Sequence, residues 1–510
     1  MKNIRWSVLL VPMILLLVAS ALSLIKPEYF LESMTNLNQW LLNNFSLSFS
    51  ITALCMFLIC TALYISPVSK NKIGGENSEK LLSPLSYFAV VLCTTVAVGI
   101  LFWGCAEPLY HLQSPPSSFG ITPLSIQAET LSLSILYLHW TLTPYAIYTL
   151  PAIVFAYAYY NSGFSFSLSS LIKPIYSKIP QVGESLIDSI CLFALCAGMA
   201  ASLGSGLLSL KGGLERFLPA ATPSYLILGG LSFFIVSSFL VSSISGLQKG
   251  IKKLSGINTL LFFIFCFWIL VNYANGEWLF KTWKSISFYV SNFFNLSILK
   301  ESWPQPSSWT KSWSSFYWAN WMAWAPITAL FLGYISRGYT LREVLRYTWI
   351  YTSLFGFFWM SIFSGSTLSL FRNDGHLLID QLKTKGPESI AFSLFESVPG
   401  ASFLIPLFIL TIFISYVTAA DSNITAISNL CQNSSKKEDN NATSSNTSTT
   451  FLKIVWGVLI GFIAFTMVNA SGIEGIKTLS NLGGLPALAL MIGVCISAIK
   501  LIFSKPEKLA

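Results

Sequence analysis

Aromatic side chains gather in one stretch of the sequence at a spacing that could hold a cation. Residues 313 to 324 contain four tryptophans and one tyrosine. At about 100° per residue of helix, Tyr317, Trp321 and Trp324 fall on one narrow sector, with Trp313 and Trp318 at its edges. Because no carboxylate stands among these rings, the stripe suits a quaternary ammonium group, which donates no hydrogen bond and is attracted by ring quadrupoles. The alternative interpretation is that the rings pack in a core or face lipid.

The stripe belongs to an apolar run that ends at Arg337, and the whole chain has the composition of a membrane protein. Of its 510 residues, 54% are hydrophobic and 10% are charged, whereas soluble domains carry about 25% charged residues. The net charge of +9 is typical of basic loops facing an anionic leaflet, and no basic cluster indicates a nucleic-acid partner. The nine cysteines form no C-x-x-C pair, so neither a disulfide framework nor a metal site is expected.

Apolar runs of spanning length predict an all-α polytopic membrane protein with about twelve transmembrane helices. The runs lie near residues 7–25, 46–66, 85–112, 132–159, 185–210, 223–246, 256–274, 313–335, 346–371, 400–430, 451–469 and 479–503. The first is interpreted as a retained span, because it is long for the core of a cleaved signal. The aromatic segment Trp278 to Leu299 is interrupted by lysines and is expected at the membrane surface.

The distribution of Lys and Arg predicts the orientation of these spans. If the N-terminus is cytoplasmic and the spans alternate, 19 of the 30 Lys and Arg residues fall on the cytoplasmic side, so both termini are expected there. The polar, low-complexity segment 432–450 is predicted to be a disordered cytoplasmic loop. Residues 504–510 are predicted to form a short cytoplasmic tail, which argues against osmotic regulation by a long basic tail.

Two spans contain residues that disfavour a helix. The third span carries a β-branched, glycine-containing run from Cys93 to Gly99, and the tenth carries hydroxyls and a carboxylate from Val417 to Ser422. Non-helical backbone at membrane depth is tolerated only beside protein or a water-filled cavity, and in secondary transporters such breaks mark the ion and substrate site. We therefore expect both spans to be broken, the alternative being ordinary helix packing.

Four motifs resemble those of the betaine/choline/carnitine transporter (BCCT) family. They are F-Y-W-A-x-W-x-x-W-x-P with I-S-R-G-x-T-x-R-E inside Trp313–Glu343, and the runs Leu101–Tyr110, His139–Tyr148 and Ser202–Gly206. The resemblance implies a secondary transporter with a LeuT-like core: two peripheral helices in residues 1–80, a first five-helix repeat in 81–275, an interfacial segment in 276–312 and a second, inverted repeat in 313–503. It also implies a multi-pass protein of the bacterial inner membrane that forms homotrimers and takes up betaine, choline or carnitine, in most members with sodium.

Carried over from the family, an ammonium cage would consist of Trp140, Tyr145 and Tyr148 in the fourth span and Trp321 in the eighth. Tyr145 stands where relatives usually have tryptophan, and a phenol ring offers a weaker π face. Asn320 is a second departure, because a tryptophan often precedes the cage residue Trp321. Its amide can donate to a carboxylate or hydroxyl of the substrate, so the specificity is expected to differ from that for plain glycine betaine.

Two further tryptophans of the eighth span, Trp324 and Trp318, are expected to line the path on the cytoplasmic side or to pack the core. The resemblance places a sodium site at Cys93, Val96, Val417 and Thr418. A serine of the family is replaced here by alanine at 419, so the site would be weakened. A second family site has lost its side chains, which would be Leu195, Met199 and Ile327.

Sodium-coupled symport through one weakened site is therefore favoured, and no cofactor is expected besides that coupling ion. The open alternatives are a sodium-independent exchanger and a transporter for another zwitterion such as an amino acid. An integral membrane enzyme is disfavoured, because His111, His139 and His376 are interpreted as scattered and no phosphate-binding loop is present. Glu107, which precedes a proline, is interpreted as a structural partner rather than a proton relay.

Overall fold

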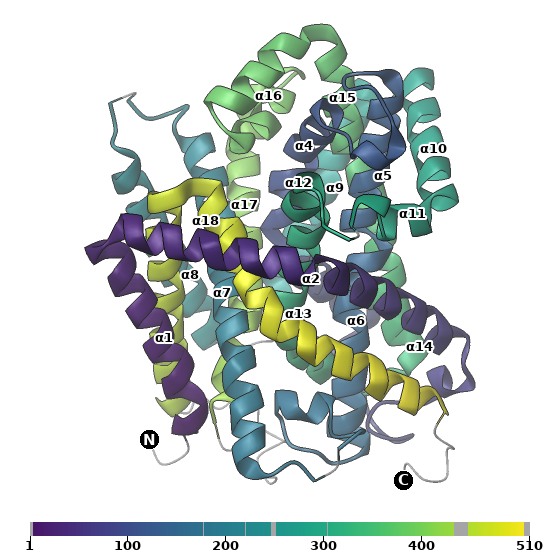
Figure 1. Ribbon diagram of the computed structural model, residues 1–510, viewed down its shortest axis with the longest axis vertical. Coiled ribbons are helices and arrows are strands. Elements are labelled where there is room, and N and C mark those ends of the chain that lie inside the picture. Colours follow the sequence, from purple (N-terminus) through teal and green to yellow (C-terminus); the bar gives the residue numbers. More distant parts are fainter. Residues whose placement is uncertain are drawn as a thin grey trace.

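The computed structural model describes residues 4–176, 178–219, 221–245, 251–302, 304–432 and 447–503. Throughout these residues the chain is built from helices, joined by short turns and two isolated β-bridges. Long helices stand side by side along the vertical axis of Figure 1, and both termini lie at its lower end. The predicted loop 432–450 falls mostly on residues 433–446, and the predicted tail on 504–510, both outside the described residues.

Two helices form the periphery. α1 is Trp6–Ile25 and α2 is the long helix Pro27–Ile65, which crosses the face of the molecule shown in Figure 1. Both helices expose large apolar side chains such as Val11, Ile14 and Trp40, as expected where lipid or another apolar surface replaces water. α1 packs on α7 (Gln181–Leu214) and α18 (Thr447–Phe503), and α2 packs on α18 and α6 (Leu142–Ala156).

The third and fourth predicted spans are each divided into two helices. The third consists of α3 (Pro84–Thr95) and α4 (Ala97–Gln113), which meet at Val96 with a bend of 53°. The expected break is therefore confirmed here. The fourth span was expected to be continuous, but α5 (Ile126–Trp140) and α6 (Leu142–Ala156) are separated by Thr141, whose φ of −127° and ψ of −115° are not helical.

The remaining helices of the first half and the link to the second follow in chain order. They are α7 (Gln181–Leu214), α8 (Ser224–Ser245), α9 (Ile251–Tyr273), α10 (Gly276–Ser291), α11 (Phe293–Ser297) and α12 (Ser308–Thr310). α10 has exposed apolar residues such as Leu279 and Trp283 beside its lysines. This mixture agrees with the surface helix predicted for residues 278–299.

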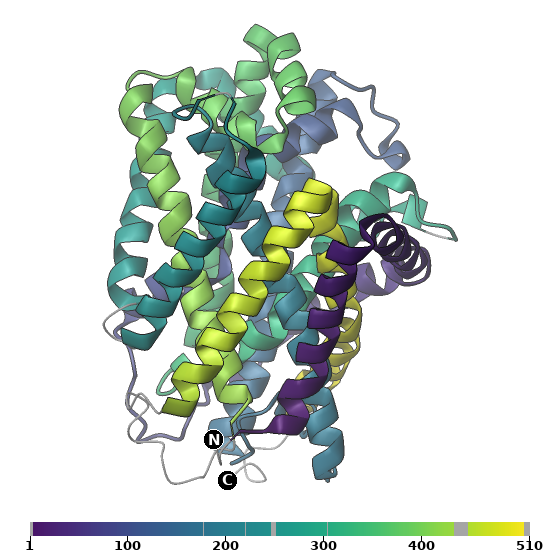
Figure 2. The same cartoon turned by 90° about the vertical axis from the view of Figure 1, so that its left-hand side faces the viewer.

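The second half begins with the aromatic stripe. Its helices are α13 (Phe316–Ile335), α14 (Leu341–Val344), α15 (Thr352–Thr384), α16 (Ile390–Glu396), α17 (Ala401–Leu430) and α18 (Thr447–Phe503). α18 contains a sharp kink at Gly472, whose φ is +54°, a conformation that glycine adopts without steric cost. Figure 2 shows the two arms of α18 at different angles to α1. α13 packs on α6 and α18.

Nine helices within the described part of the chain are long and apolar enough to cross a membrane, and the bent pair of α3 and α4 makes a tenth. α13 is not among these helices, since its tryptophans, tyrosines and asparagine lower its mean hydropathy. The two arms of α18 are counted as one helix among the nine. Adding α13 and separating those arms gives the twelve predicted spans.

The predicted break in the tenth span is wrong, because α17 runs without interruption through Val417–Ser422. Its polar side chains bond to carbonyls of their own helix: the Thr418 hydroxyl donates to Ile414 O at 2.7 Å, and the Asn423 amide donates to Ala419 O at 2.8 Å. Because these groups find partners inside the helix, they do not force the backbone to open.

Candidate functional site

A cavity lies where the broken third span meets the aromatic stripe. It is bordered by Thr94, Thr95, Val96, Gly99, Trp103, Trp140, Tyr148, Ala201, Ser202, Ser205, Phe316, Asn320, Trp321, Trp324, Ile476 and Ser480. These residues come from the α3 and α4 junction, α5, α6, α7, α13 and α18. The lining therefore combines aromatic rings with hydroxyl and amide groups, and no charged side chain of the described residues belongs to it.

The aromatic part of the lining is centred on Trp321. Its ring centroid lies 5.5 Å from that of Trp140 and 5.0 Å from that of Tyr148, with interplanar angles of 76° and 64°. Tyr145 is a third edge-on neighbour at 5.8 Å. The structure thus brings together the four residues predicted to form a cage, although Tyr145 is fully buried behind Trp321 and does not border the cavity.

The other two tryptophans predicted on α13 separate in space. Trp324 borders the cavity. Trp318 is almost fully buried, and its ring lies edge-on to the imidazole of His139 at 5.7 Å, away from the cavity lining. Trp324 therefore lies at the cavity, and Trp318 lies in the core.

Asn320 lies at the polar side of the cavity, on α13 next to Trp321. Its Oδ1 is 3.0 Å from the hydroxyl of Ser480 on α18. The Ser480 hydroxyl is also 3.0 Å from Ile476 O of its own helix. With Oδ1 engaged by Ser480, the two N–H groups of the amide are the donors that Asn320 can offer to a bound molecule.

The backbone breaks position the aromatic rings. Because α5 ends at Trp140, the last carbonyls of that helix lack intrahelical partners, and the Trp321 indole donates to His139 O at 3.1 Å. Glycines allow two other helices to approach Trp140 closely. A Cβ on Gly99 would lie 2.8 Å from the Trp140 ring, and one on Gly356 would lie 2.5 Å from Trp140 O.

Behind the aromatic rings of the cavity lining lies a buried polar cluster that the sequence interpretation missed. Glu107 Oε1 is 3.0 Å from Nε2 of His111 and 2.8 Å from Nδ1 of His139, and Oε2 accepts from the Trp140 indole at 2.7 Å and from the Tyr317 hydroxyl at 2.5 Å. The interpretation of His111 and His139 as scattered is therefore wrong, because α4 and α5 are neighbours that bring them to one carboxylate. The signal available in the sequence was a glutamate inside an apolar run, since intramembrane carboxylates usually carry a function.

Among the described residues, Glu107, His111 and His139 form a group that could bind a metal ion. One ligand atom from each of these side chains lies within 4.8 Å of the others. However, both imidazoles already lie at hydrogen-bond distance from one carboxylate oxygen, and the other oxygen is engaged by Trp140 and Tyr317. Both carboxylate oxygens of Glu107 are therefore already engaged by hydrogen-bond partners. The side chain of His376 lies outside the described residues.

Of the residues predicted to hold sodium, one borders the cavity and three lie outside its lining. Val96 borders the cavity at the break, but Cys93, Val417 and Thr418 do not. The Cys93 thiol is directed toward α9, 3.4 Å from Ser255 O, and the hydroxyl of Thr418 is engaged within α17.

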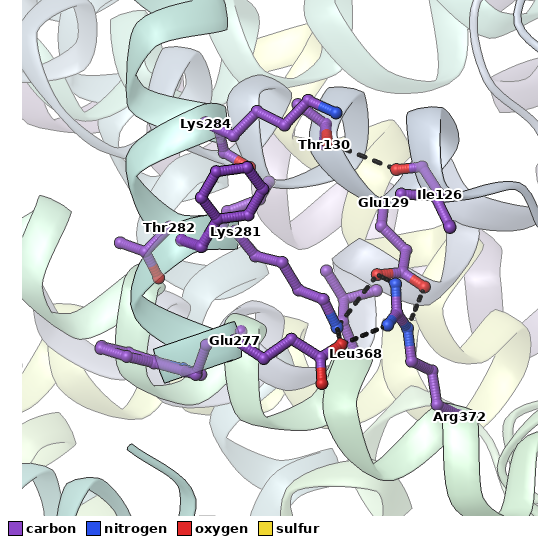
Figure 3. A pocket seen from close by; sticks show the side chains of 14 residues that line it. Ile126, Glu129, Thr130, Glu277, Lys281, Thr282, Lys284, Leu368 and Arg372 are labelled. Carbon is purple, nitrogen blue, oxygen red and sulfur yellow. Dashed lines mark hydrogen bonds and ion pairs between the residues drawn. The ribbon is translucent and has the colours of Figure 1, made fainter. Parts of the chain in front are cut away.

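A second cavity lies between α5, α10 and α15 and is shown in Figure 3. Arg372 donates to both oxygens of Glu129 at 2.7 Å and to Glu277 at 2.5 Å, and Lys281 lies 2.6 Å from Glu277. Hydrogen bonding and charge from Lys281, with a smaller effect of Arg372, lower the pKa of the exposed Glu277 carboxyl. Because these charges pair with one another, the cluster is suited to joining three helices rather than to binding a free ion.

A family model described as "BCCT, betaine/carnitine/choline family transporter" matches residues 7–507. The chain belongs to the BCCT family. It is therefore a multi-pass membrane transporter and not an enzyme, as the four motifs indicated.

Individual relatives agree with this assignment. The chain is 30% identical over 457 residues to the glycine betaine transporter OpuD of Bacillus subtilis (strain 168), covering 89% of this chain and 85% of that protein. It is 25% identical over 504 residues to a glycine betaine transporter of Acinetobacter baylyi, covering 98% and 73%. It is 28% identical over 439 residues to the high-affinity choline transport protein of Escherichia coli (strain K12), covering 85% and 62%.

Among solved structures, a Na+-coupled sialic acid symporter in a substrate-bound, outward-open state has the same fold. The TM-score is 0.52 at 14% identity, over 88% of this chain and 85% of that one. At this identity the likeness concerns the fold alone, and it supports the LeuT-like core predicted for this BCCT transporter.

Proposed function

We propose that this BCCT protein is a secondary active transporter for a quaternary ammonium compound of the glycine betaine, choline or carnitine type. The observation that carries the proposal is the edge-on contact of Trp140 and Tyr148 with Trp321 at 5.5 and 5.0 Å. These rings lie beside a cavity whose lining, in the described part of the chain, has no charged side chain. A trimethylammonium group offers no N–H donor, so π faces suit it better than a carboxylate ion pair inside a membrane.

The polar wall favours a substrate with a second functional group. Asn320, Ser202 and Thr94 lie in the same lining as the rings, so a carboxylate or hydroxyl at the other end of the substrate would meet hydroxyl and amide donors. Because Asn320 replaces an aromatic ring, a zwitterionic amino acid is the second candidate. Competition by proline or methionine against labelled betaine separates the two classes.

We propose sodium as the coupling ion, through one weakened site at the third-span break. Its support is the 53° break between α3 and α4 beside the cavity, because a broken helix frees carbonyl oxygens. The sodium-independent exchanger is the competing mechanism. The exchanger is supported because the thiol of Cys93 and the hydroxyl of Thr418 already donate hydrogen bonds to backbone carbonyls.

We also propose insertion in a bacterial plasma membrane as a homotrimer, with both termini cytoplasmic. Ile4 pairs with Gln432 in an isolated bridge, and Arg5 N donates to Cys431 O at 2.8 Å. The N-terminal segment thus lies on the same side as the loop that the charge count predicts to be cytoplasmic. Cysteine labelling from either side of intact cells and the mass of the detergent-solubilised protein test these two points.

The decisive experiment is uptake into proteoliposomes of labelled glycine betaine, choline and carnitine, with and without an inward sodium gradient. Saturable uptake of at least one compound, stimulated by the gradient, is expected. Lack of uptake and of binding for all three would refute the substrate class. Equal uptake with and without sodium, together with counterflow driven by internal substrate, would refute sodium coupling and support the exchanger.

A further inference from the structure

One carboxylate lies directly behind the aromatic wall of the cavity. The side chain of Glu107 is fully buried on α4, and its Oε2 accepts the indole N–H of Trp140 at 2.7 Å. Trp140 borders the cavity and Glu107 does not. The indole ring therefore stands between the carboxylate and the space in which the proposed ammonium group would lie.

The partners of Glu107 suit an ionised carboxylate. Four groups converge on its two oxygens, and an ionised carboxylate has about four acceptor positions. Nδ1 of His111 has no hydrogen-bond partner among the described residues, which suits the bare nitrogen of a neutral imidazole, because a protonated ring would leave a buried N–H unpaired. The Ser314 hydroxyl is 3.3 Å from Nε2 of His139 and can donate to it. With both imidazoles neutral, the cluster keeps one negative charge.

We propose that Glu107 tunes the cavity for positive charge, acting through Trp140. The proposal rests on the proposed function, since it assigns Glu107 a role in holding the ammonium group. A charged acceptor on the indole N–H fixes the orientation of the ring and polarises it, so that the π face becomes more negative. The carboxylate also acts directly, because at an effective dielectric constant of about 20 a unit charge roughly 10 Å away changes the affinity for a cation about tenfold. Glu107 is thus a positioning residue that favours cationic groups without touching them.

The test compares ligands that differ only in the charge of one atom. Glycine betaine and 3,3-dimethylbutanoate have the same shape, with N+ in the first and carbon in the second, and choline and 3,3-dimethylbutanol form the corresponding pair. Affinities are measured by competition against labelled betaine or choline, whichever the wild type takes up. In Glu107→Gln the ratio of the affinity for the ammonium compound to that for its carbon isostere is expected to fall about tenfold, because any effect on the rest of the molecule is common to both members of a pair.

The same measurement distinguishes charge from simple support of the site. Equal weakening of both members of a pair would overturn the proposal and leave Glu107 a structural residue. If the wild type binds none of betaine, choline and carnitine, the proposed function fails instead, and this is seen before any variant is made. Tyr317→Phe is the matched control, because it removes one donor from Oε2 and leaves the charge. It is expected to retain the wild-type ratio between ammonium compound and isostere.

A second variant keeps the proposal testable if Glu107→Gln does not fold. Trp140→Phe retains an aromatic face but lacks the N–H that links the ring to Glu107. It is expected to weaken the ammonium compound severalfold more than the isostere. Equal effects on the two ligands would show that the link through the indole does not matter, which would overturn the proposal by an independent route.

Discussion

Trp321 is the residue on which the cage depends, and its replacement by alanine gives the sharpest test of the site. Its ring is 3% exposed and lies edge-on to three others, those of Trp140, Tyr145 and Tyr148, at centroid distances of 5.0 to 5.8 Å. Its indole also donates to His139 O. Trp321→Ala therefore removes one π face of the cage and the packing contacts with the three neighbouring rings. It also leaves the carbonyl of His139 without its indole donor.

The expected losses in binding and in folding differ in size. A desolvated cation loses about 2 kcal/mol when one aromatic face of its site is removed, which corresponds to roughly 30-fold weaker binding. Truncation of a buried tryptophan costs about 3–5 kcal/mol of folding stability. Trp321→Phe keeps a weaker π face and is expected to weaken binding only about threefold to fivefold.

The assay must separate these two effects, and Trp318 provides the control. It lies one helical turn before Trp321, is 1% exposed and does not border the cavity. Trp318→Ala should therefore lower the melting temperature in detergent about as much as Trp321→Ala does, while leaving the affinity for betaine or choline within about twofold of the wild type. Binding is measured by calorimetry on folded protein, and uptake in proteoliposomes.

Two results would refute this reasoning. Wild-type affinity in Trp321→Ala would show that the rings are packing residues and that the ammonium group binds elsewhere. Equal loss of affinity in the two alanine variants would show that the binding effect follows from instability and not from a lost π face.

Three further predictions follow from other contacts. Arg372→Gln should destabilise the protein by about 1–3 kcal/mol in thermal unfolding, because it leaves the buried carboxylate of Glu129 with only the ammonium group of Lys281, 3.9 Å away. Unchanged betaine affinity is expected, and an unaltered melting temperature would contradict the proposed joint between helices. Asn320→Ala should weaken betaine several times more than choline in competition assays, and equal effects would argue against an amide contact with a carboxylate. Gly99→Ala should raise the KM for uptake by displacing the Trp140 ring, whereas Gly230→Ala, whose Cβ would meet no atom within 4 Å, should not.

Much of the architecture was predictable because it depends on residues close together in the sequence. Apolar runs of spanning length require helices in a bilayer, since no water is present there to satisfy an open backbone. The run from Cys93 to Gly99 predicted the bend at Val96, because β-branched residues and glycine weaken a helix. The spacing of Tyr317, Trp321 and Trp324 predicted a shared helix face for the same local reason.

Where a polar side chain finds its partner was decided only by the tertiary structure. The hydroxyls from Val417 to Ser422 could have served an open backbone, but Thr418 bonds to a carbonyl one turn earlier in an intact helix. Asn320 meets Ser480, which lies in a distant part of the chain. The Asn320 contact depends on which helices become neighbours, and the sequence pattern of one helix carries no information about its neighbours.

The Glu107 cluster shows the same division most clearly. The sequence by itself determined that a glutamate and two histidines stand in apolar runs, and that a tryptophan follows His139 directly. Only the packing of α4 against α5 and α13 placed His111, His139, Trp140 and Tyr317 around one carboxylate. A buried charge requires several donors at once, and donors from three helices can converge only after those helices have packed.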